Sequence, residues 1–208
     1  MAENKQTARL EAFSDGVFAI AMTLLILEIR VPQLPEGAGN RELGSALLAL
    51  WPSFAAFAAS FGTILTMWTH HHQLCSFVTR VDRRLFFSNG LLLFLVTFIP
   101  FPTAVAARHL GCAAARAATM FYCGTFFLMA LAFQVLLDAV ARDGDVPRAP
   151  SDQRTLDAIR RSYQLGPLSY GAAALLAFFS PLLGFVICAI MWIFWSLMDY
   201  RNAARHDA

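Results

Sequence analysis

Polar side chains that could do chemistry gather at the start of the first apolar segment. Arg9, Phe13, Ser14 and Asp15 occupy the first turns of a stretch that is otherwise apolar as far as Ile29. An ionisable group near the start of a membrane-length helix is costly to desolvate, so it indicates a role in function or assembly. An Asp/Ser pair at a helix start is also typical of capping and of anion stabilisation by the helix dipole. The sequence alone leaves both interpretations open.

A second polar group ends the next apolar segment, where the sequence reads Trp68-Thr69-His70-His71-His72. Two successive spans would place this group at the same level as Asp15. The indole nitrogen of Trp68 can only donate a hydrogen bond, and a histidine can donate from either ring nitrogen, so both types suit a partly buried carboxylate. A hydrogen-bonded network between the first two spans is therefore predicted.

The histidine run does not predict a metal site. Adjacent residues on a helix point about 100° apart, so three consecutive histidines do not converge, and the usual pair of histidines four residues apart is absent. The four cysteines, Cys75, Cys112, Cys123 and Cys188, are scattered and lack zinc-ligand spacing. No cofactor or metal is expected, and the cysteines are interpreted as small packing residues.

An apolar stripe runs along the first segment. At about 100° per residue, five side chains fall within about 60° of Ile20: Phe13, Val17, Leu24, Leu27 and Val31. Thr23 borders the stripe, whereas Asp15 and Leu25 each lie about 140° from Ile20. The stripe is compatible with ordinary helix packing. It is equally compatible with symmetric copies that line a pore and gate by dewetting at rings of Ile20, Leu24 and Leu27.

The composition indicates that these segments lie in a membrane. Hydrophobic residues make up 58% of the 208 residues and charged residues only 14%, against about 25% charged in a soluble domain. Ser180-Pro181 divides the last apolar region, because one helix from Pro167 to Leu197 would run about 46 Å, well beyond a hydrocarbon core of about 30 Å. The predicted fold is an all-α integral membrane protein with six transmembrane helices, at about 12–31, 46–68, 85–107, 117–140, 165–180 and 182–199, and a cytoplasmic loop at 141–163.

The distribution of basic residues predicts the orientation. Six spans put both termini on one side, and of the 16 Lys and Arg residues all but Arg30, Arg41, Arg108 and Arg116 fall on that side. The positive-inside rule then makes both termini cytoplasmic, in a multi-pass protein of the plasma membrane. A net charge of +2 and the lack of a basic block interleaved with aromatics exclude nucleic acid as a partner.

Several of these motifs together resemble the transmembrane protein 175 family, the potassium channels of endosomes and lysosomes and their bacterial relatives. The resemblance rests on Arg9-x-x-x-Phe13-Ser14-Asp15, Trp68-x-x-His71-His72, Asp82-Arg83-Arg84 and Asn89. A single six-span repeat resembles the prokaryotic members, which assemble as tetramers, whereas the animal proteins carry two repeats and dimerise. The resemblance implies a homo-tetramer in which the first helix of each subunit lines a central pore.

The resemblance also implies residue roles. Ile20 matches the narrowest hydrophobic ring, Leu24 and Leu27 match further rings, and Thr23 matches a threonine layer linked to potassium selectivity. The signature network that fixes the pore helix corresponds to Arg9, Phe13, Ser14, Asp15, Trp68, His71, His72 and Asn89, with His71 favoured as the equivalent histidine. The chain contains no Thr-Val-Gly-Tyr-Gly segment, so selectivity would not come from the carbonyl filter of ordinary potassium channels.

Potassium conduction is accordingly the predicted function, with potassium ions, the lipid bilayer and further copies of the chain as partners. The alternative is a secondary transporter that uses Asp15 in proton or ion coupling, although transporters usually hold such groups near the bilayer midplane. An enzyme built on His70–His72 and Asp82 would lack a conventional nucleophile and base, so no enzymatic activity is expected.

Overall fold

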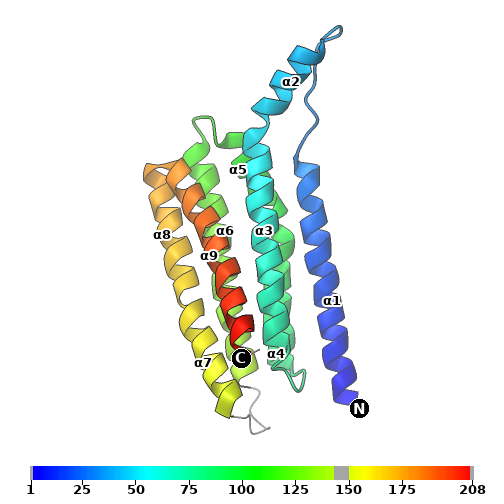
Figure 1. The fold of residues 1–208 in the computed structure, drawn as a ribbon, viewed down its shortest axis with the longest axis vertical. Helices are drawn as coiled ribbons and strands as arrows, with labels where there is room; N and C mark the ends of the chain where they lie inside the picture. Colours follow the sequence, from blue (N-terminus) through cyan, green and yellow to red (C-terminus); the bar gives the residue numbers. More distant parts are fainter. Residues whose placement is uncertain (1, 143–149, 207–208) are drawn as a thin grey trace.

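A computed structural model describes residues 2–142 and 150–206, and every regular element in these ranges is a helix. The helices form an elongated bundle (Figure 1). Their bounds are α1 Ala2–Leu24, η1 Leu25–Glu28, α2 Asn40–Ala49, α3 Trp51–Cys75, α4 Arg83–Phe98, α5 Pro100–His109, α6 Ala115–Ala141, α7 Pro150–Tyr163, α8 Leu165–Phe179 and α9 Pro181–His206.

Prolines and one aspartate determine several of these boundaries. Pro100 and Pro181 each begin a helix, where their missing N–H costs nothing because the first helical amides have no intrahelical acceptor. Pro52 lies in the first turn of α3 for the same reason. Asp82 caps α4 by accepting a hydrogen bond of 2.6 Å from the amide of Leu85. The expected span at 85–107 is therefore two consecutive helices, α4 and α5.

Four helical segments within the described residues are long and apolar enough to cross a membrane: Gln6–Glu28, Arg83–His109, Ala115–Ala141 and Pro181–Met198. The pair α2 and α3, bent by 46°, makes a fifth if it is one span. The expected span at 165–180 coincides with α8, but its 15 residues reach only about 22 Å, less than the hydrocarbon core of about 30 Å. The sixth crossing stays a prediction.

Part of the segment 141–163, expected to be a loop, is helical. Residues 143–149 lie outside the described part, and α7 follows at Pro150–Tyr163. Leu156, Ile159 and Tyr163 are buried at helical spacing, whereas Asp157 and Arg160 face outward. Arg160 also forms an ion pair with Asp138 of α6. The helix was missed because its many polar residues outweighed a short amphipathic stripe.

The centre of the bundle is α6, which contacts α3, α4, α5, α7, α8 and α9. Helix α1 packs mainly against α3 and α4, apart from its continuation η1, and Figure 1 shows it at the edge of the bundle. A helix in this position buries one face in the bundle and leaves the other uncovered.

Close packing of α9 depends on small residues. A Cβ added to Gly62 of α3 would lie 2.2 Å from Cε2 of Trp192, so the indole packs directly on the glycine. Cys123 of α6 and Cys188 of α9 are buried free thiols with their sulfur atoms 3.3 Å apart. These two cysteines are packing residues, as the sequence predicted.

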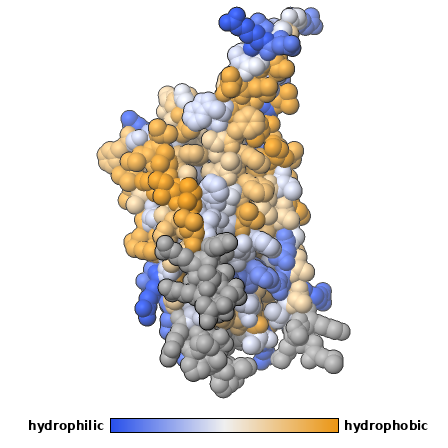
Figure 2. Space-filling view, viewed as in Figure 1, coloured by the Kyte–Doolittle hydropathy of each residue, from blue (hydrophilic) through white to orange (hydrophobic). Residues whose placement is uncertain are grey.

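On the face seen in Figure 2, the surface that is not covered by grey atoms is largely apolar along the bundle, with hydrophilic residues towards its ends. Beyond one end, α2 and the turn before it extend past the other helices (Figure 1). No residue of α2 is buried, and the preceding turn contains Gly37 with a φ of 85°, the left-handed conformation that favours glycine. The start of α1 and the end of α9 both lie at the opposite end.

Candidate functional site

The two faces of α1 have different environments. Ser14, Phe18, Ala21 and Leu25 follow one another at helical spacing, and all four are fully buried against the subunit. On the other side the predicted stripe is uncovered along most of its length, with exposures of 65% for Phe13, 58% for Ile20 and 70% for Leu27. Leu24 and Val31 are exposed as well, and only Val17 is partly buried. The described residues therefore leave most of this stripe uncovered.

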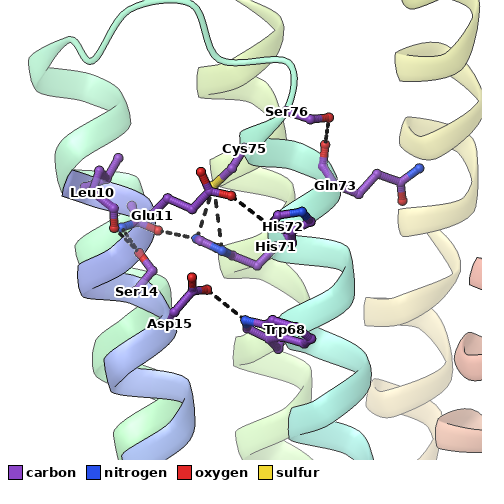
Figure 3. Close-up of polar contacts among 11 residues, drawn as sticks. Leu10, Glu11, Ser14, Asp15, Trp68, His71, His72, Gln73, Cys75 and Ser76 are labelled. Carbon is purple, nitrogen blue, oxygen red and sulfur yellow. Dashed lines mark hydrogen bonds and ion pairs between the residues drawn. The ribbon is translucent and has the colours of Figure 1, made fainter. Parts of the chain in front are cut away.

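A short hydrogen bond joins α1 to α3 near the end of the bundle. The indole Nε1 of Trp68 donates to Oδ1 of Asp15 over 2.8 Å, and Figure 3 shows the two side chains pointing toward each other. A bond to an ionised acceptor is stronger than one between neutral groups, and part-burial shields it from water. The predicted pairing of Asp15 with the end of the second span is thus present.

A chain of buried hydrogen bonds joins α3, α4 and α1. Nε2 of His71 lies 2.8 Å from Oδ1 of Asn89, and Nδ2 of Asn89 donates to Oγ of Ser14 over 3.0 Å. Ser14 in turn donates to the carbonyl of Leu10 over 2.8 Å.

The carbonyl of Leu10 sets the direction of this chain, because it can only accept. Ser14 must therefore donate to it and accept from the amide of Asn89. The side-chain oxygen of Asn89 then accepts a hydrogen bond from the Nε2–H group of His71. The three side chains hold α1 in one register against α3 and α4.

One ion pair in this region was not predicted. Nδ1 of His72 lies 2.8 Å from Oε1 of Glu11, and Figure 3 places this pair one turn away from Asp15 and Trp68. The sequence held the signal, since Glu11 precedes Asp15 by four residues and His72 follows Trp68 by four. Two helices that pair at one position and run antiparallel also pair one turn along.

The consecutive histidines contact three different neighbours. His70 meets the rings of Tyr163 and Trp195 edge-on, with centroids 5.7 and 5.8 Å away. His71 faces Asn89 on α4, and His72 faces α1. They therefore do not converge on one point, and the described residues contain no cluster of three metal-ligating side chains.

Arg9 and Phe13 lie outside the hydrogen-bonded network that the structure describes. Both side chains are exposed, and Phe13 belongs to the uncovered stripe. Thr23 is exposed too, and its hydroxyl donates to the carbonyl of Ile20 over 2.8 Å. The hydroxyl oxygen of Thr23 keeps its lone pairs available beside the stripe.

Taken together, the fold and this site define a helical membrane protein whose first helix is fixed on one face and uncovered on the other. A family model described as "Endosomal/lysosomal potassium channel TMEM175" matches residues 9–100. A potassium channel of Chamaesiphon minutus is 46% identical over 197 residues, which cover 94% of this chain and 96% of that relative. A potassium channel of Streptomyces collinus is 42% identical over 98% of each chain.

The fold agrees with that of a solved structure. The crystal structure of a lysosomal potassium-selective channel TMEM175 homolog from Chamaesiphon minutus superposes with a TM-score of 0.85 at 45% identity, covering 94% of this chain and 98% of that one. The chain belongs to the TMEM175 family and is a multi-pass membrane protein.

Proposed function

We propose that the chain is the subunit of a homo-tetrameric, potassium-selective cation channel, with four copies of α1 around a central pore. Relatives of nearly the same length, 46% and 42% identical, are named potassium channels. One observation carries the proposal for the pore: the stripe through Ile20 is uncovered, while the opposite face of α1 is buried and hydrogen-bonded.

Exposure by itself does not distinguish a pore from a lipid contact, because lipid also covers apolar side chains. The polar contacts at Asp15 and Ser14 make the difference. A helix that merely faced lipid would need no such contacts, and burying polar groups is costly even when they are paired. A helix whose copies must meet around an axis needs a fixed rotation, which these contacts supply.

In this proposal Ile20 forms the narrowest ring, and Leu24 and Leu27 form further rings toward η1. Branched aliphatic side chains exclude water from a narrow passage, so the closed state is blocked by dewetting and by sterics. A potassium ion would have to shed or rearrange its hydration shell to pass.

Thr23 is proposed to contribute to selectivity. Its hydroxyl donates a hydrogen bond to the carbonyl of Ile20. The lone pairs of the hydroxyl oxygen can therefore face a passing cation. Four such oxygens would offer a polar layer next to the apolar rings.

Arg9, Phe13, Ser14 and Asp15, together with Trp68, His71, His72 and Asn89, are proposed as the signature network. The contacts of Ser14 and Asp15 support a positioning role within the subunit. For Arg9 and Phe13, which are exposed, the proposal places the partners across the subunit interface.

The proposed topology has six spans, with α8 as a short one, and both termini in the cytoplasm of a cell whose plasma membrane holds the protein. The location of the start of α1 and the end of α9 at one end of the bundle supports an even number of crossings. The arginine-rich segments that the sequence assigns to the same side support the orientation.

A transporter that couples ions through Asp15 is less well supported. The carboxylate is occupied by the indole of Trp68, and it lies toward one end of the bundle, whereas coupling sites in transporters lie near the midplane.

Reconstitution of the purified protein into planar bilayers tests the proposed function. With potassium on one side of the bilayer and sodium on the other, we expect unitary current steps. We also expect a reversal potential that is shifted from zero in the direction that indicates a higher permeability to potassium than to sodium. Slow flux without steps would support the transporter instead. Steps with no discrimination between the two cations would leave a channel but contradict the proposed role of Thr23.

A further inference from the structure

A surface groove with a charged rim lies at the start of α4. It has a volume of about 700 Å³ and runs between α4 and α6, a size within the range of ligand sites. The residues that matter for its chemistry are Asp82, Arg83, Arg84, Phe87, Leu91 and Val135. The contacts described above leave this groove without a role.

The rim is positively charged. Arg83 and Arg84 are exposed in the first turn of α4, and neither guanidinium forms an ion pair with a described residue. The carboxylate of Asp82 accepts a hydrogen bond from the amide of Leu85 and so serves to cap the helix. The guanidinium of Arg83 lies 5.7 Å from the centre of the Phe87 ring, which leaves its outer N–H groups available.

The floor of the groove is apolar. Phe87 and Leu91 of α4 and Val135 of α6 are all exposed there. Leu91 lies seven residues beyond Arg84, which is about 10 Å along the helix axis. The groove therefore changes from cationic to apolar over the distance that separates a lipid headgroup from its acyl chains.

We propose that this groove binds an anionic phospholipid. The two guanidinium groups hold the phosphate, since arginine forms bidentate hydrogen bonds to phosphate oxygens. One acyl chain lies along Phe87, Leu91 and Val135. The groove is at the end of the bundle where α1 begins (Figure 1), which the proposed topology places in the cytoplasmic leaflet, where anionic lipids concentrate.

Other occupants fit less well. A soluble anion would use the arginines but leave the apolar floor uncovered. A second copy of the chain would bury two unpaired guanidinium groups unless it supplied an anion, and burying an unpaired charge is costly.

Native mass spectrometry of the detergent-solubilised protein tests the proposal. The protein is mixed with equal amounts of phosphatidylglycerol and phosphatidylcholine that carry the same acyl chains. We expect a preference of roughly tenfold or more for phosphatidylglycerol, because each basic residue near an anionic lipid surface contributes appreciably. The double substitution Arg83→Gln/Arg84→Gln should abolish the preference for phosphatidylglycerol. The double substitution Arg83→Lys/Arg84→Lys should retain most of that preference.

The matched control removes two arginines elsewhere. Arg108 and Arg116 are also exposed but lie outside the groove, so Arg108→Gln/Arg116→Gln should leave the preference unchanged. Leu91→Ser should weaken binding of both lipids by removing part of the acyl-chain contact.

Three outcomes would overturn the proposal. The first is an unchanged preference in the Arg83→Gln/Arg84→Gln protein. The second is competition by soluble glycerol 3-phosphate at the same concentration, which would indicate an anion site without a lipid. The third is efficient disulfide crosslinking between subunits at Leu91→Cys with no bound lipid, which would show that a second copy covers the groove. These measurements report lipid binding or contact between copies and not ion flux, so a failure of this proposal can be told apart from a failure of the channel proposal.

Discussion

At the scale of single residues, Ile20 is where a polar substitution discriminates best between the faces of α1. In the Ile20→Asn protein, four amide groups would wet the proposed constriction, so we expect a larger potassium current and weaker discrimination against sodium. Conductance and reversal potential under bi-ionic potassium/sodium conditions measure both effects.

Ile26 provides the control for this substitution, because it is also an exposed isoleucine, at 50%, and lies roughly a third of a turn from Ile20 around the axis. Ile26→Asn should leave permeation close to that of the unmodified protein. If Ile26→Asn altered permeation and Ile20→Asn did not, the proposed pore-lining face of α1 would be the wrong one. Leu25 is unsuitable as a control since it is fully buried, and an asparagine there would disturb packing.

Asn89 is the second residue whose role can be measured. In the Asn89→Leu protein, Nε2 of His71 and Oγ of Ser14 both lose a partner in a buried environment. We expect a loss of about 1–3 kcal/mol in the free energy of unfolding for each buried group left unpaired. Thermal unfolding in mild detergent, followed by loss of monodisperse protein, reports the change.

The partly exposed pair of Glu11 and His72 serves as the comparison. An ion pair with one well-exposed partner contributes about 0–1 kcal/mol, so Glu11→Gln should shift the midpoint far less than Asn89→Leu. Equal shifts of the unfolding midpoint in the two proteins would show that the buried chain of hydrogen bonds contributes no more to stability than the Glu11–His72 pair.

The sequence predicted which helices are joined by hydrogen bonds better than it predicted which residues belong to the network. The pairing of Asp15 with the end of the second span was expected because membrane-buried polar groups need partners, whereas Asn89 entered the expected network only through the family resemblance and its contact with Ser14 was not specified. The ion pair of Glu11 with His72 was missed, although its spacing of one turn from Asp15 and Trp68 held the signal. Arg9, in contrast, was expected in the network on resemblance, and within one subunit its side chain is exposed.

At the scale of helices, the contact between α3 and α9 gives a sharp packing prediction. Gly62→Ala would place a methyl group 2.2 Å from the indole of Trp192, and overpacking of this kind costs about 1–3 kcal/mol. We expect the Gly62→Ala protein to have a lower midpoint of thermal unfolding. Adding Trp192→Leu to this protein should restore much of the lost stability.

Gly124 is the control glycine, since a Cβ there would meet no atom within 4 Å. Gly124→Ala within α6 should be neutral or stabilising, because alanine has the higher helix propensity. A Gly62→Ala protein as stable as the Gly124→Ala protein would mean that α9 can shift away from α3 at little cost.

Helix boundaries show where periodicity succeeds and where it does not. The stripe from Phe13 to Val31 was predicted by spacing alone, and it is largely the uncovered face of α1. Helix α7 was missed because only Leu156, Ile159 and Tyr163 mark its buried face. The break at Pro100 was missed as well, because a proline in an apolar run can either kink a span or begin a new helix.

At the scale of the whole molecule, assembly is the central expectation. One copy of α1 leaves its stripe uncovered, so a pore requires symmetric copies, and we expect a homo-tetramer. Native mass spectrometry in mild detergent, with chemical crosslinking as a second method, measures the number of subunits. A stable monomer or dimer as the sole species would contradict both the assembly and the proposed pore.

The sequence could not establish the number of subunits or crossings from its own residues. An exposed stripe has the same spacing whether lipid or another copy covers it, because both environments are apolar. The length of α8 raises a similar difficulty, since a 15-residue helix fits a thinned or partly crossed bilayer as well as a deep core position.

The arm formed by α2 and the turn at Gly37 makes the membrane orientation directly measurable. This arm extends away from the bundle at the end opposite the start of α1 (Figure 1), and its turn is surrounded by exposed residues. A protease recognition sequence inserted after Gly37 should therefore be cut in intact cells or right-side-out vesicles. The same sequence placed in the loop between α3 and α4 should be cut only after the vesicles are opened. Cleavage in the reverse order would invert the proposed orientation while leaving every contact within the bundle as described.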